Sequence, residues 1–204
     1  DHAELTEATD DGDDDRGRDL EAEVLRLGIG ARGLCLAPDR PTTVKTRIMA
    51  RHQQVARFDH ERDDNVPDEL AEQLVATVGE FAADVDAIVL QDYDKGVLVE
   101  PVIAAAIEAG RRREIPVVVD PKSRNFFGYE GATVFKPNRL ELEAALREPV
   151  QAEDPEWLDR TRRELGCEHL LVTLGEDGAA LVTAEGDYGR VPTVARSVYD
   201  VSGA

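Results

Sequence analysis

Apolar positions along the chain follow two alternating patterns, one typical of helices and one typical of buried strands. Apolar residues three or four apart predict helices, and short β-branched runs that end in polar residues predict strands. From residue 86 onward the two patterns alternate, which indicates an α/β fold with a mostly parallel sheet covered on both faces. The pattern predicts helices at 16–27, 67–81, 101–113, 138–146 and 154–165, strands at 86–93, 115–122 and 132–138, a strand and turn at 169–178, and a hairpin-like pair at 179–183 and 187–192.

Residues 42–59, with the sequence TTVKTRIMARHQQVARFD, alternate between polar and apolar side chains over long stretches. This period of two predicts two extended strands, with a turn near Arg51 to Gln53. The segment contains Lys45, one of only four lysines in the chain.

Polar residues follow each of the predicted parallel strands. In open α/β sheets, ligands bind at the carboxyl ends of the strands, so these polar segments are expected to meet at one edge of the sheet. They are Asp92–Lys95, Asp120–Lys122, Lys136–Asn138 and Thr173–Gly175.

The other three lysines, Lys95, Lys122 and Lys136, each follow a predicted strand, in a chain where arginine is the usual cation. A lysine ammonium is a compact point charge suited to phosphate. Three lysines at one edge of the sheet therefore favour an anionic ligand, and the alternative is ordinary solvated loop lysines.

Two short motifs lie at strand ends. In KPNRLELE (136–143), Asn138 and Glu141 have the spacing of a helix capping box, and they could also hold Mg²⁺ through water; the spacing alone favours the cap. In LVTLGEDG (171–178), two glycines follow a strand and would let the backbone approach a nucleotide. Alone, this second motif favours a plain β-turn.

The composition excludes several classes of partner and location. A net charge of −19 argues against nucleic acid and anionic membranes as partners. The acid-rich, lysine-poor balance suggests a salt-adapted surface, with a simply acidic protein as the alternative. No apolar run has membrane-spanning length, and the acidic start of the chain is not a signal peptide. Cys35 and Cys167 are expected to be free thiols in a reducing cytoplasm. The residues GDDDRG (12–17) resemble a calcium loop only superficially.

Four motifs occur in the order found in the ribokinase-like (PfkB) carbohydrate kinases, which the chain resembles. GDDDRGRDL (12–20) is similar to that family's GDDxxGxxL, KPNRLE contains its NxxE motif, and LVTLGEDG resembles its nucleotide-binding VTxGxxG. DVSGA (200–204) is similar to the opening of its DTxGAGD signature. The resemblance implies a three-layer α/β sandwich with a mostly parallel central sheet and a small β lid.

Residues 41–59 narrow the resemblance to the heptose-phosphate kinase domain of bifunctional ADP-heptose synthases. They are similar to TTxKxRxxxxxQQxxRxD, QDYDKGVL (91–98) is similar to SDYxKGxL, and residues 119–138 are similar to DPKxxxFxxYxGATxxxPN. The resemblance implies transfer of the ATP γ-phosphoryl group to the anomeric hydroxyl of D-glycero-D-manno-heptose 7-phosphate, in the synthesis of ADP-heptose for the lipopolysaccharide core. It also implies a homodimer formed through the lid. The alternatives are a kinase for another sugar or a nucleoside, and a non-catalytic protein that keeps the kinase scaffold.

The resemblance also implies roles for individual residues, with ATP and Mg²⁺ as the small-molecule partners. The nucleotide side would comprise Lys136, Asn138, Thr173, Gly175 and Gly178, and Asn138 and Glu141 would organise Mg²⁺ through water. The substrate side would comprise Lys45, Arg47, Gln53, Arg57, Asp92, Lys95 and Lys122, with Lys122 also a candidate for the ATP phosphates.

By the same resemblance, Gly203 and Ala204 would begin the anion hole, and the catalytic aspartate would follow them. The family also has a sugar-binding segment before GDDxxG and helices after the anion hole. Residues 1–204 are therefore expected to form an incomplete kinase domain that is inactive and poorly stable alone.

Overall fold

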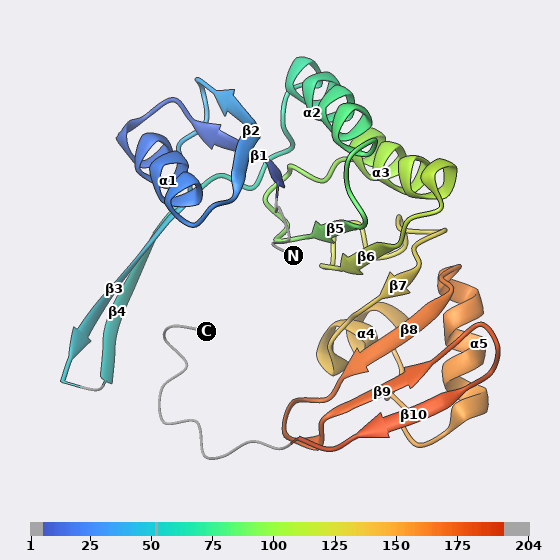
Figure 1. The fold of residues 1–204 in the computed structure, drawn as a ribbon. Helices are drawn as coiled ribbons and strands as arrows, with labels where there is room; N and C mark the ends of the chain where they lie inside the picture. The colour runs from blue at the N-terminus through green and yellow to red at the C-terminus, as the bar shows by residue number, and fades with distance from the viewer. Residues whose placement is uncertain (1–5, 52, 194–204) are drawn as a thin grey trace. The chain divides into compact units, whose positions relative to one another are not determined.

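The computed structural model describes residues 6–51 and 53–193 and is shown in Figure 1. The chain divides into two compact units. The first comprises Asp1–Asp84 and Asp94–Ala106, and the second comprises Val85–Tyr93 and Ile107–Ala204. Each unit is considered by itself.

The second unit is built on a six-stranded sheet with the order β10-β9-β8-β7-β6-β5. Neighbouring strands from β5 to β8 are parallel, whereas β9 and β10 are antiparallel additions. The predicted parallel strands and the hairpin-like pair are thus confirmed. The strands are β5 (Ile88–Gln91), β6 (Val117–Asp120), β7 (Val134–Phe135), β8 (His169–Thr173), β9 (Ala179–Val182) and β10 (Tyr188–Val191).

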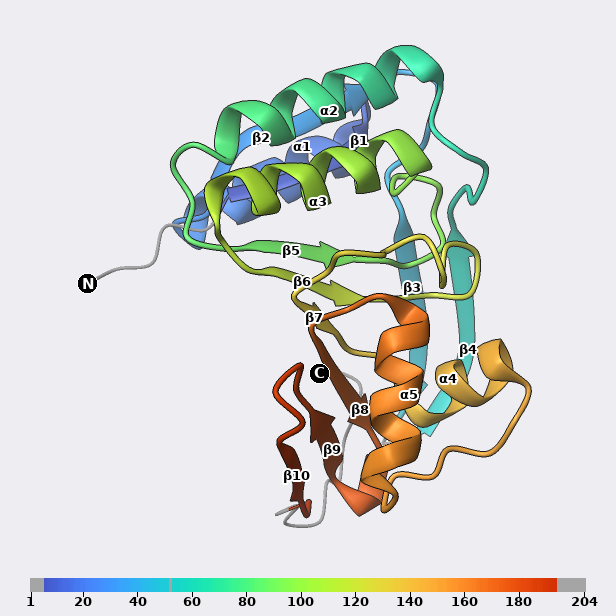
Figure 2. The ribbon, with the colours of Figure 1, turned by 90° about the vertical axis from the view of Figure 1, so that its right-hand side faces the viewer.

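Two helices of this unit, α4 (Arg139–Leu146) and α5 (Pro155–Leu165), lie where the apolar period placed them. Asp154 caps α5 by accepting hydrogen bonds from two backbone N–H groups, and Gly166 ends the helix at φ +68°. The apolar side of α5 lies along β8 and β9, as Figure 2 shows, and buries Trp157 and Leu158. A single-turn 3₁₀ helix, Gly175–Asp177, follows β8.

The first unit begins with β1 (Thr6–Gly12), α1 (Asp15–Arg26) and β2 (Gly30–Ala37), and the two strands pair in parallel. The helix predicted at 16–27 agrees with α1, but the sequence predicted neither strand. Residues 6–12 read TEATDDG, which lacks an apolar run, and the glycines at 30 and 33 interrupt the pattern of β2.

Two further helices follow, α2 (Asp68–Phe81) and α3 (Glu100–Arg113), and the first unit includes α3 only as far as Ala106. Leu70 and Leu74 of α2 share a buried cluster with Ala37 of β2 and Val102 near the start of α3. This cluster is the apolar core of the first unit, and both helices agree with the prediction.

The strands β3 (Val44–Ala50) and β4 (Gln53–His60) form a separate antiparallel sheet, called here the β ribbon. It confirms the strand pair predicted for 42–59. Most of its residues are exposed, including Ile48 (47%) and Phe58 (61%). The ribbon has little core of its own, so its shape depends on backbone pairing and on contacts at its base.

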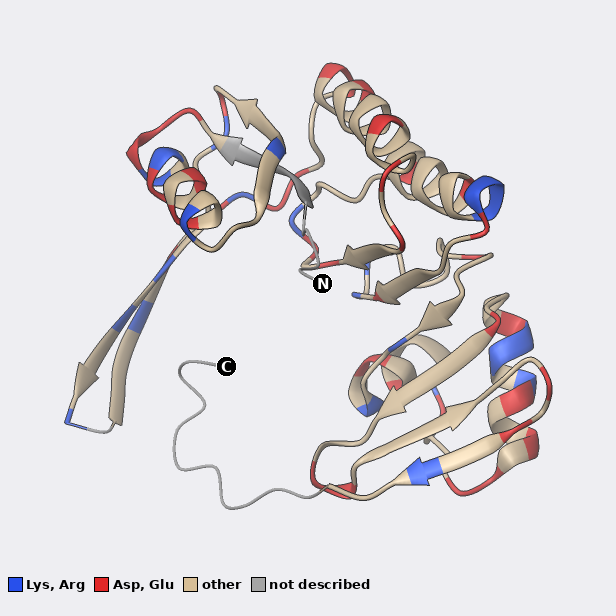
Figure 3. Cartoon of the chain, in the orientation of Figure 1, with Lys and Arg blue, Asp and Glu red and all other residues tan. Residues whose placement is uncertain are grey.

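Acidic residues are spread over both units, and basic residues stand out on the ribbon and at the end of α3 (Figure 3). No helix among the described residues is long and apolar enough to cross a membrane. Cys35 and Cys167 are both free thiols, and burial raises the pKa of Cys167 to about 11.

Candidate functional site

Polar side chains at the ends of β5, β6 and β7 contact one another, as the strand order predicts. Asp120 ends β6, and its Oδ2 accepts from Nε2 of Gln91 (2.8 Å) and pairs with Nζ of Lys136 (3.0 Å). Two residues further on, Asn138 forms an isolated parallel bridge with Thr173 at the end of β8. The structure thus places Asp120 beside Lys136 and Asn138 beside Thr173, whereas the contact from β5 comes from Gln91, which the sequence did not single out.

The N-terminus of α4 carries the expected capping box. Oδ1 of Asn138 accepts from the backbone N–H of Glu141 (2.9 Å), and Oε2 of Glu141 accepts from the backbone N–H of Asn138 (2.8 Å). The other oxygen of Glu141 pairs with Lys122, which follows β6. These three residues line a pocket of ≈ 370 Å³, together with Ser123, Phe126, Phe127, Leu140, Ala144 and Ala145.

Glu141 and Asn138 are the residues expected to organise Mg²⁺. Their oxygens already accept hydrogen bonds in the capping box, but each oxygen has a second lone pair. Within residues 6–51 and 53–193 there is no group of three or more His, Cys, Asp or Glu side chains that could hold a metal ion. Asn138 and Glu141 offer two oxygen donors, which fits an ion that takes its remaining ligands from water and phosphate oxygens, as Mg²⁺ does.

The turn after Thr173 carries two glycines with positive φ, and they have different explanations. Gly178 has φ +87°, and a Cβ there would lie 1.9 Å from the carbonyl oxygen of Val191, so the chain's own packing requires this glycine. Gly175 has φ +63°, and among the described residues no atom beyond its chain neighbours lies within 4 Å of the position a Cβ would take. The hydroxyl of Thr193 donates to the carbonyl oxygen of Gly175 (2.8 Å). A ligand can therefore approach the Cβ side of Gly175, whereas the fold alone explains Gly178.

Asp92 follows β5 and is only 3% exposed. Its carboxylate accepts a hydrogen bond from the hydroxyl of Tyr129 (2.7 Å), a partner that the sequence did not suggest. The structure gives this carboxylate a buried partner, and its expected contact with a sugar stays a prediction.

In the first unit, the strand register of the β ribbon assigns its basic residues to one face. Lys45 is opposite Asp59, and Arg47 is opposite Arg57. Alternate residues of a strand, and directly opposed residues of a pair, project to the same face. Lys45, Arg47 and Arg57 therefore share a face, and Nε of Arg57 pairs with Oδ1 of Asp59 (3.0 Å).

A register shift after Ile48 changes the assignment at the tip of the ribbon. Met49 is opposite Gln54, and Ala50 is opposite Gln53. Because Met49 is two residues after Arg47, Gln54 shares the basic face and Gln53 lies on the other one. The resemblance implied Gln53, and a bulge that moves the face by one residue leaves no signal in a simple alternation.

At the base of the ribbon, Glu61 pairs with two lysines. Its Oε2 lies 2.8 Å from Nζ of Lys45, and its Oε1 lies 2.6 Å from Nζ of Lys95. Hydrogen bonds from Lys45 and then Lys95 lower the pKa of Glu61 from 4.5 to about 2. Lys45 also contacts Asp59 (3.3 Å). Sequence reasoning named both lysines but missed the carboxylate between them.

Arg40, whose side chain is only 8% exposed, holds two backbone segments at the base of the ribbon. Its guanidinium donates to the carbonyl oxygens of Asp64 (2.8 Å) and Lys95. Gly96, at φ +77°, lies so close that a Cβ would be 2.0 Å from the carbonyl oxygen of Asp64. The segment that leaves the ribbon and the loop that carries Lys95 are therefore packed tightly against each other.

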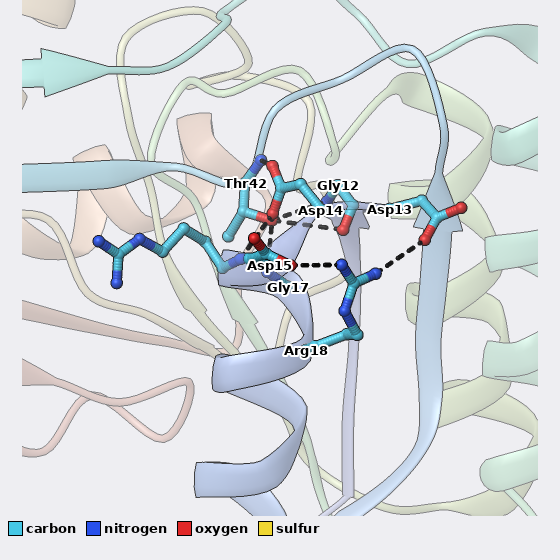
Figure 4. A network of polar contacts seen from close by, with 8 residues as sticks. Gly12, Asp13, Asp14, Asp15, Gly17, Arg18 and Thr42 are labelled. Carbon is cyan, nitrogen blue, oxygen red and sulfur yellow. Dashed lines mark hydrogen bonds and ion pairs between the residues drawn. The ribbon is translucent and has the colours of Figure 1, made fainter.

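A second set of contacts fastens the entry to the ribbon, and Figure 4 shows it from close by. Asp14, the N-cap of α1, accepts hydrogen bonds from the backbone N–H groups of Arg16 and Gly17 (2.9 Å each), and from the N–H (3.1 Å) and hydroxyl (2.9 Å) of Thr42. The hydroxyl oxygen of Thr42 accepts from the N–H of Gly12 (3.0 Å). The GDDDRG segment thus serves as a helix cap that holds the ribbon, and not as a calcium loop.

Gly203 and Ala204, expected to begin the anion hole, lie outside the described residues. Of the other candidates, Lys45, Arg47, Gln53, Arg57 and Lys95 belong to the first unit, and Asp92, Lys122, Lys136, Asn138, Glu141, Thr173, Gly175 and Gly178 belong to the second.

Known proteins resemble the chain in sequence over nearly its whole length. The proteins named "Bifunctional protein HldE" of Pelobacter propionicus and Geotalea uraniireducens are 40% and 41% identical to it over 206 and 197 residues. These alignments cover 99% and 95% of the chain, but only 42% and 40% of the relatives. The chain therefore spans about two fifths of the length of the curated relatives it matches.

Solved structures show the same fold. Phosphofructokinase-2 of Escherichia coli in complex with potassium has a TM-score of 0.76 and 18% identity, over 96% of this chain and 63% of that one. Arabidopsis thaliana ribokinase complexed with ribose and ATP has a TM-score of 0.69 and 17% identity, over 98% of this chain and 65% of that one. The expected ribokinase-like α/β fold is confirmed. Residues 11–204 match the family model described as pfkB family carbohydrate kinase, and the chain belongs to this family.

Proposed function

We propose that the full-length protein transfers the γ-phosphoryl group of ATP to the anomeric hydroxyl of D-glycero-D-manno-heptose 7-phosphate. The observation that carries this proposal is the convergence of Lys45 and Lys95 on a single carboxylate at the base of the β ribbon. Two ammonium groups that reach one oxyanion can also reach the phosphate that such a substrate carries. The resemblance of residues 41–59 to heptose-phosphate kinases names the sugar.

In this proposal the first unit binds the phosphosugar. Lys45 and Lys95 contact its phosphate as point charges, and Arg47 and Arg57, on the same face of the ribbon as Lys45, offer guanidinium groups that can bind a phosphate bidentately. Gln54 joins these candidates, since the strand register assigns it to the basic face, and Gln53 stays a candidate on the other face.

The second unit binds the nucleotide. Phosphoryl transfer depends mainly on positioning and on stabilising the charge of the transferred group. Lys122 and Lys136 supply positive charge next to the carboxyl ends of β6 and β7, and the backbone at Gly175 is open to the nucleotide. Glu141 and Asn138 would hold Mg²⁺ through water, and the ion would neutralise phosphate charge.

Two further properties belong to the proposal. The full-length protein forms a homodimer through the apolar face of the ribbon, where Ile48 and Phe58 are exposed. It works in the cytoplasm, where its two free thiols stay reduced.

The test is ADP release by the full-length protein with ATP, Mg²⁺ and a panel of acceptors. The panel contains heptose 7-phosphate, unphosphorylated heptose, fructose 6-phosphate, ribose and a nucleoside. We expect turnover selective for heptose 7-phosphate, and a Lys45→Ala variant with a higher KM for it, by about tenfold for the loss of one charged hydrogen bond.

Unphosphorylated heptose is the internal control, because its weaker turnover should not depend on Lys45. Preference for another acceptor would replace the heptose assignment, and turnover with none of them would favour a non-catalytic scaffold. An unchanged KM in Lys45→Ala would remove Lys45 from the site.

A further inference from the structure

Glu61 ion-pairs with two of the four lysines in the chain, one through each of its carboxylate oxygens. The contacts are short, at 2.8 Å to Lys45 and 2.6 Å to Lys95. The lysines come from distant parts of the sequence, one from β3 and one from the loop after β5. Glu61 therefore occupies the point where the two ammonium groups meet.

The backbone fixes this meeting point. Arg40 donates to carbonyl oxygens on both sides of the contact, at Lys95 itself and at Asp64, three residues after Glu61. The close approach of Gly96 to Asp64 adds a second constraint. The two lysines are thus brought together by the packing of the chain, and not only by the flexible reach of their side chains.

Charge balance decides whether a phosphate group can bind beside Glu61. Lys45, Lys95 and Arg57 face two carboxylates, those of Glu61 and Asp59, which leaves one positive charge. A phosphate monoester brings close to two negative charges at pH 7. Binding beside Glu61 would leave an excess of negative charge at two lysines, whereas binding in place of Glu61 leaves a neutral site.

The Glu61 side chain can leave the two lysines, because it is 23% exposed and can turn toward water. The hydrogen bonds that lower its pKa favour the paired carboxylate, so its displacement has a cost that the incoming phosphate must offset. The phosphate that replaces it offers three oxygens to the same donors.

We propose that Glu61 holds the place of the substrate phosphate: it pairs with Lys45 and Lys95 until a dianionic group displaces it. Neutral sugars cannot displace it. A ligand with a single carboxylate has the same charge as Glu61 and therefore gains nothing by replacing it. Glu61 is then a specificity-determining residue, and this role rests on the proposed binding of phosphate by the two lysines.

The test compares Glu61→Gln with the wild type in the full-length protein. Glutamine has nearly the same shape but no charge, so it competes less well for the lysines. We expect Glu61→Gln to lower both the KM for the phosphosugar and the inhibition constant of inorganic phosphate by about threefold to tenfold, with kcat unchanged, because two near-surface ion pairs are removed.

Glu23→Gln is the matched control, since Glu23 pairs with Arg26 within α1, whereas Lys45 and Lys95 pair with Glu61. It should leave both constants at their wild-type values. The double variant Lys45→Ala/Glu61→Gln should lose the gain in phosphate affinity, because one of the two lysines that bind the phosphate is gone.

A raised KM in Glu61→Gln would overturn the proposal and show that Glu61 orients the lysines for substrate. Unchanged constants would overturn it as well. If Glu61→Gln folds poorly, Glu61→Asp provides the same comparison, because its shorter side chain reaches the lysines less well and should also lower both constants.

The outcome is separable from that of the proposed function. Calorimetric titration of wild type and Glu61→Gln with inorganic phosphate needs no sugar and no turnover. If heptose 7-phosphate is not the acceptor but phosphate binds Glu61→Gln more tightly, the substrate assignment fails and the role of Glu61 stands. Equal phosphate affinities would overturn the role of Glu61 whatever the acceptor.

Discussion

At the scale of single residues, Asp14 shows how one carboxylate links a helix to the β ribbon. It accepts hydrogen bonds from the first turn of α1 and from Thr42. The N–H of Gly17 and then that of Thr42 are the main causes that lower the pKa of Asp14 from 3.8 to about 2. The charged form is thus the one that the fold favours.

This shift predicts the behaviour of the protein in acid. A carboxyl group with a lowered pKa stabilises the fold fully above its unfolded pKa near 3.8, and that stability is lost as the pH falls through its folded pKa of about 2. We expect the melting temperature of the wild type to fall between about pH 4 and pH 2, and Asp14→Asn to be less stable at pH 7 with a shallower fall.

Asp13→Asn is the control, because Asp13 contacts the side chain of Arg18 and not the backbone. It should keep the wild-type slope. Glu61 has a pKa of about 2 and titrates in the same range, so Asp14→Asn removes only part of the slope. Parallel curves for Asp14→Asn and the wild type would contradict the role given to Asp14.

Sequence reasoning found the capping box, whose partners are close in the chain, and the meeting of the strand ends, which follows from a parallel sheet. It missed other contacts between residues far apart in the chain. Asn138 and Glu141 are three residues apart, so their spacing alone predicted the capping box. Tyr129 and Asp92 are 37 residues apart, and Arg40 and Lys95 are 55 apart. Contacts of this kind arise from the way the units fold, and no local pattern records them.

At the scale of elements, the β ribbon has two different faces. Lys45, Arg47 and Arg57 lie on one, and Phe58 and Ile48, opposite Thr46 and Ala56, lie on the other. A two-stranded ribbon is marginally stable by itself. An exposed apolar face is typical of a surface that binds a partner.

The proposed dimer makes this face testable. Phe58→Asp should shift the full-length protein from dimer to monomer in sedimentation velocity, because a buried phenylalanine contributes about 1.5–3 kcal/mol. Leu27→Asp is the matched control, since Leu27 is 60% exposed and Phe58 is 61% exposed. Equal sedimentation of Phe58→Asp and the wild type would exclude this face as the interface.

The elements that the sequence predicted are those whose pattern matches their final environment. The helices α2, α3 and α5 each bury one apolar side, so their period was clear. Strand β1 is acidic along much of its length and is a strand because it pairs with β2. Strand β7 spans only two residues where the apolar run predicted a longer one. Whether β1 forms a strand and how long β7 is both depend on pairing with neighbouring strands, which the sequence does not display.

At the scale of the whole molecule, the net charge of −19 opposes folding through repulsion among acidic residues. Local ion pairs such as Arg18–Asp15 and Arg111–Glu108 act the other way, but they are exposed and contribute little. Repulsion should therefore be the larger of the two electrostatic effects that salt screens.

Salt should accordingly stabilise the protein. We expect the melting temperature to rise by several degrees as NaCl increases from about 0.1 M to about 1 M, since the Debye length falls from about 10 Å to about 3 Å. Differential scanning calorimetry measures this, and sucrose at the same osmolality controls for solute exclusion. A melting temperature that falls with salt would show that the ion pairs outweigh the repulsion.

The β ribbon is held at its root and extends from there. Asp14 holds the entry through the N–H and hydroxyl of Thr42, and Arg40 holds the exit through the carbonyl oxygen of Asp64. From this root, β3 extends for seven residues, or about 23 Å. A rotation of about 10° at the root would carry the tip through about 4 Å, a distance comparable to the spacing of two strands. A small change around Arg40 would thereby move Gln54 much further than Lys45, which lies close to the root.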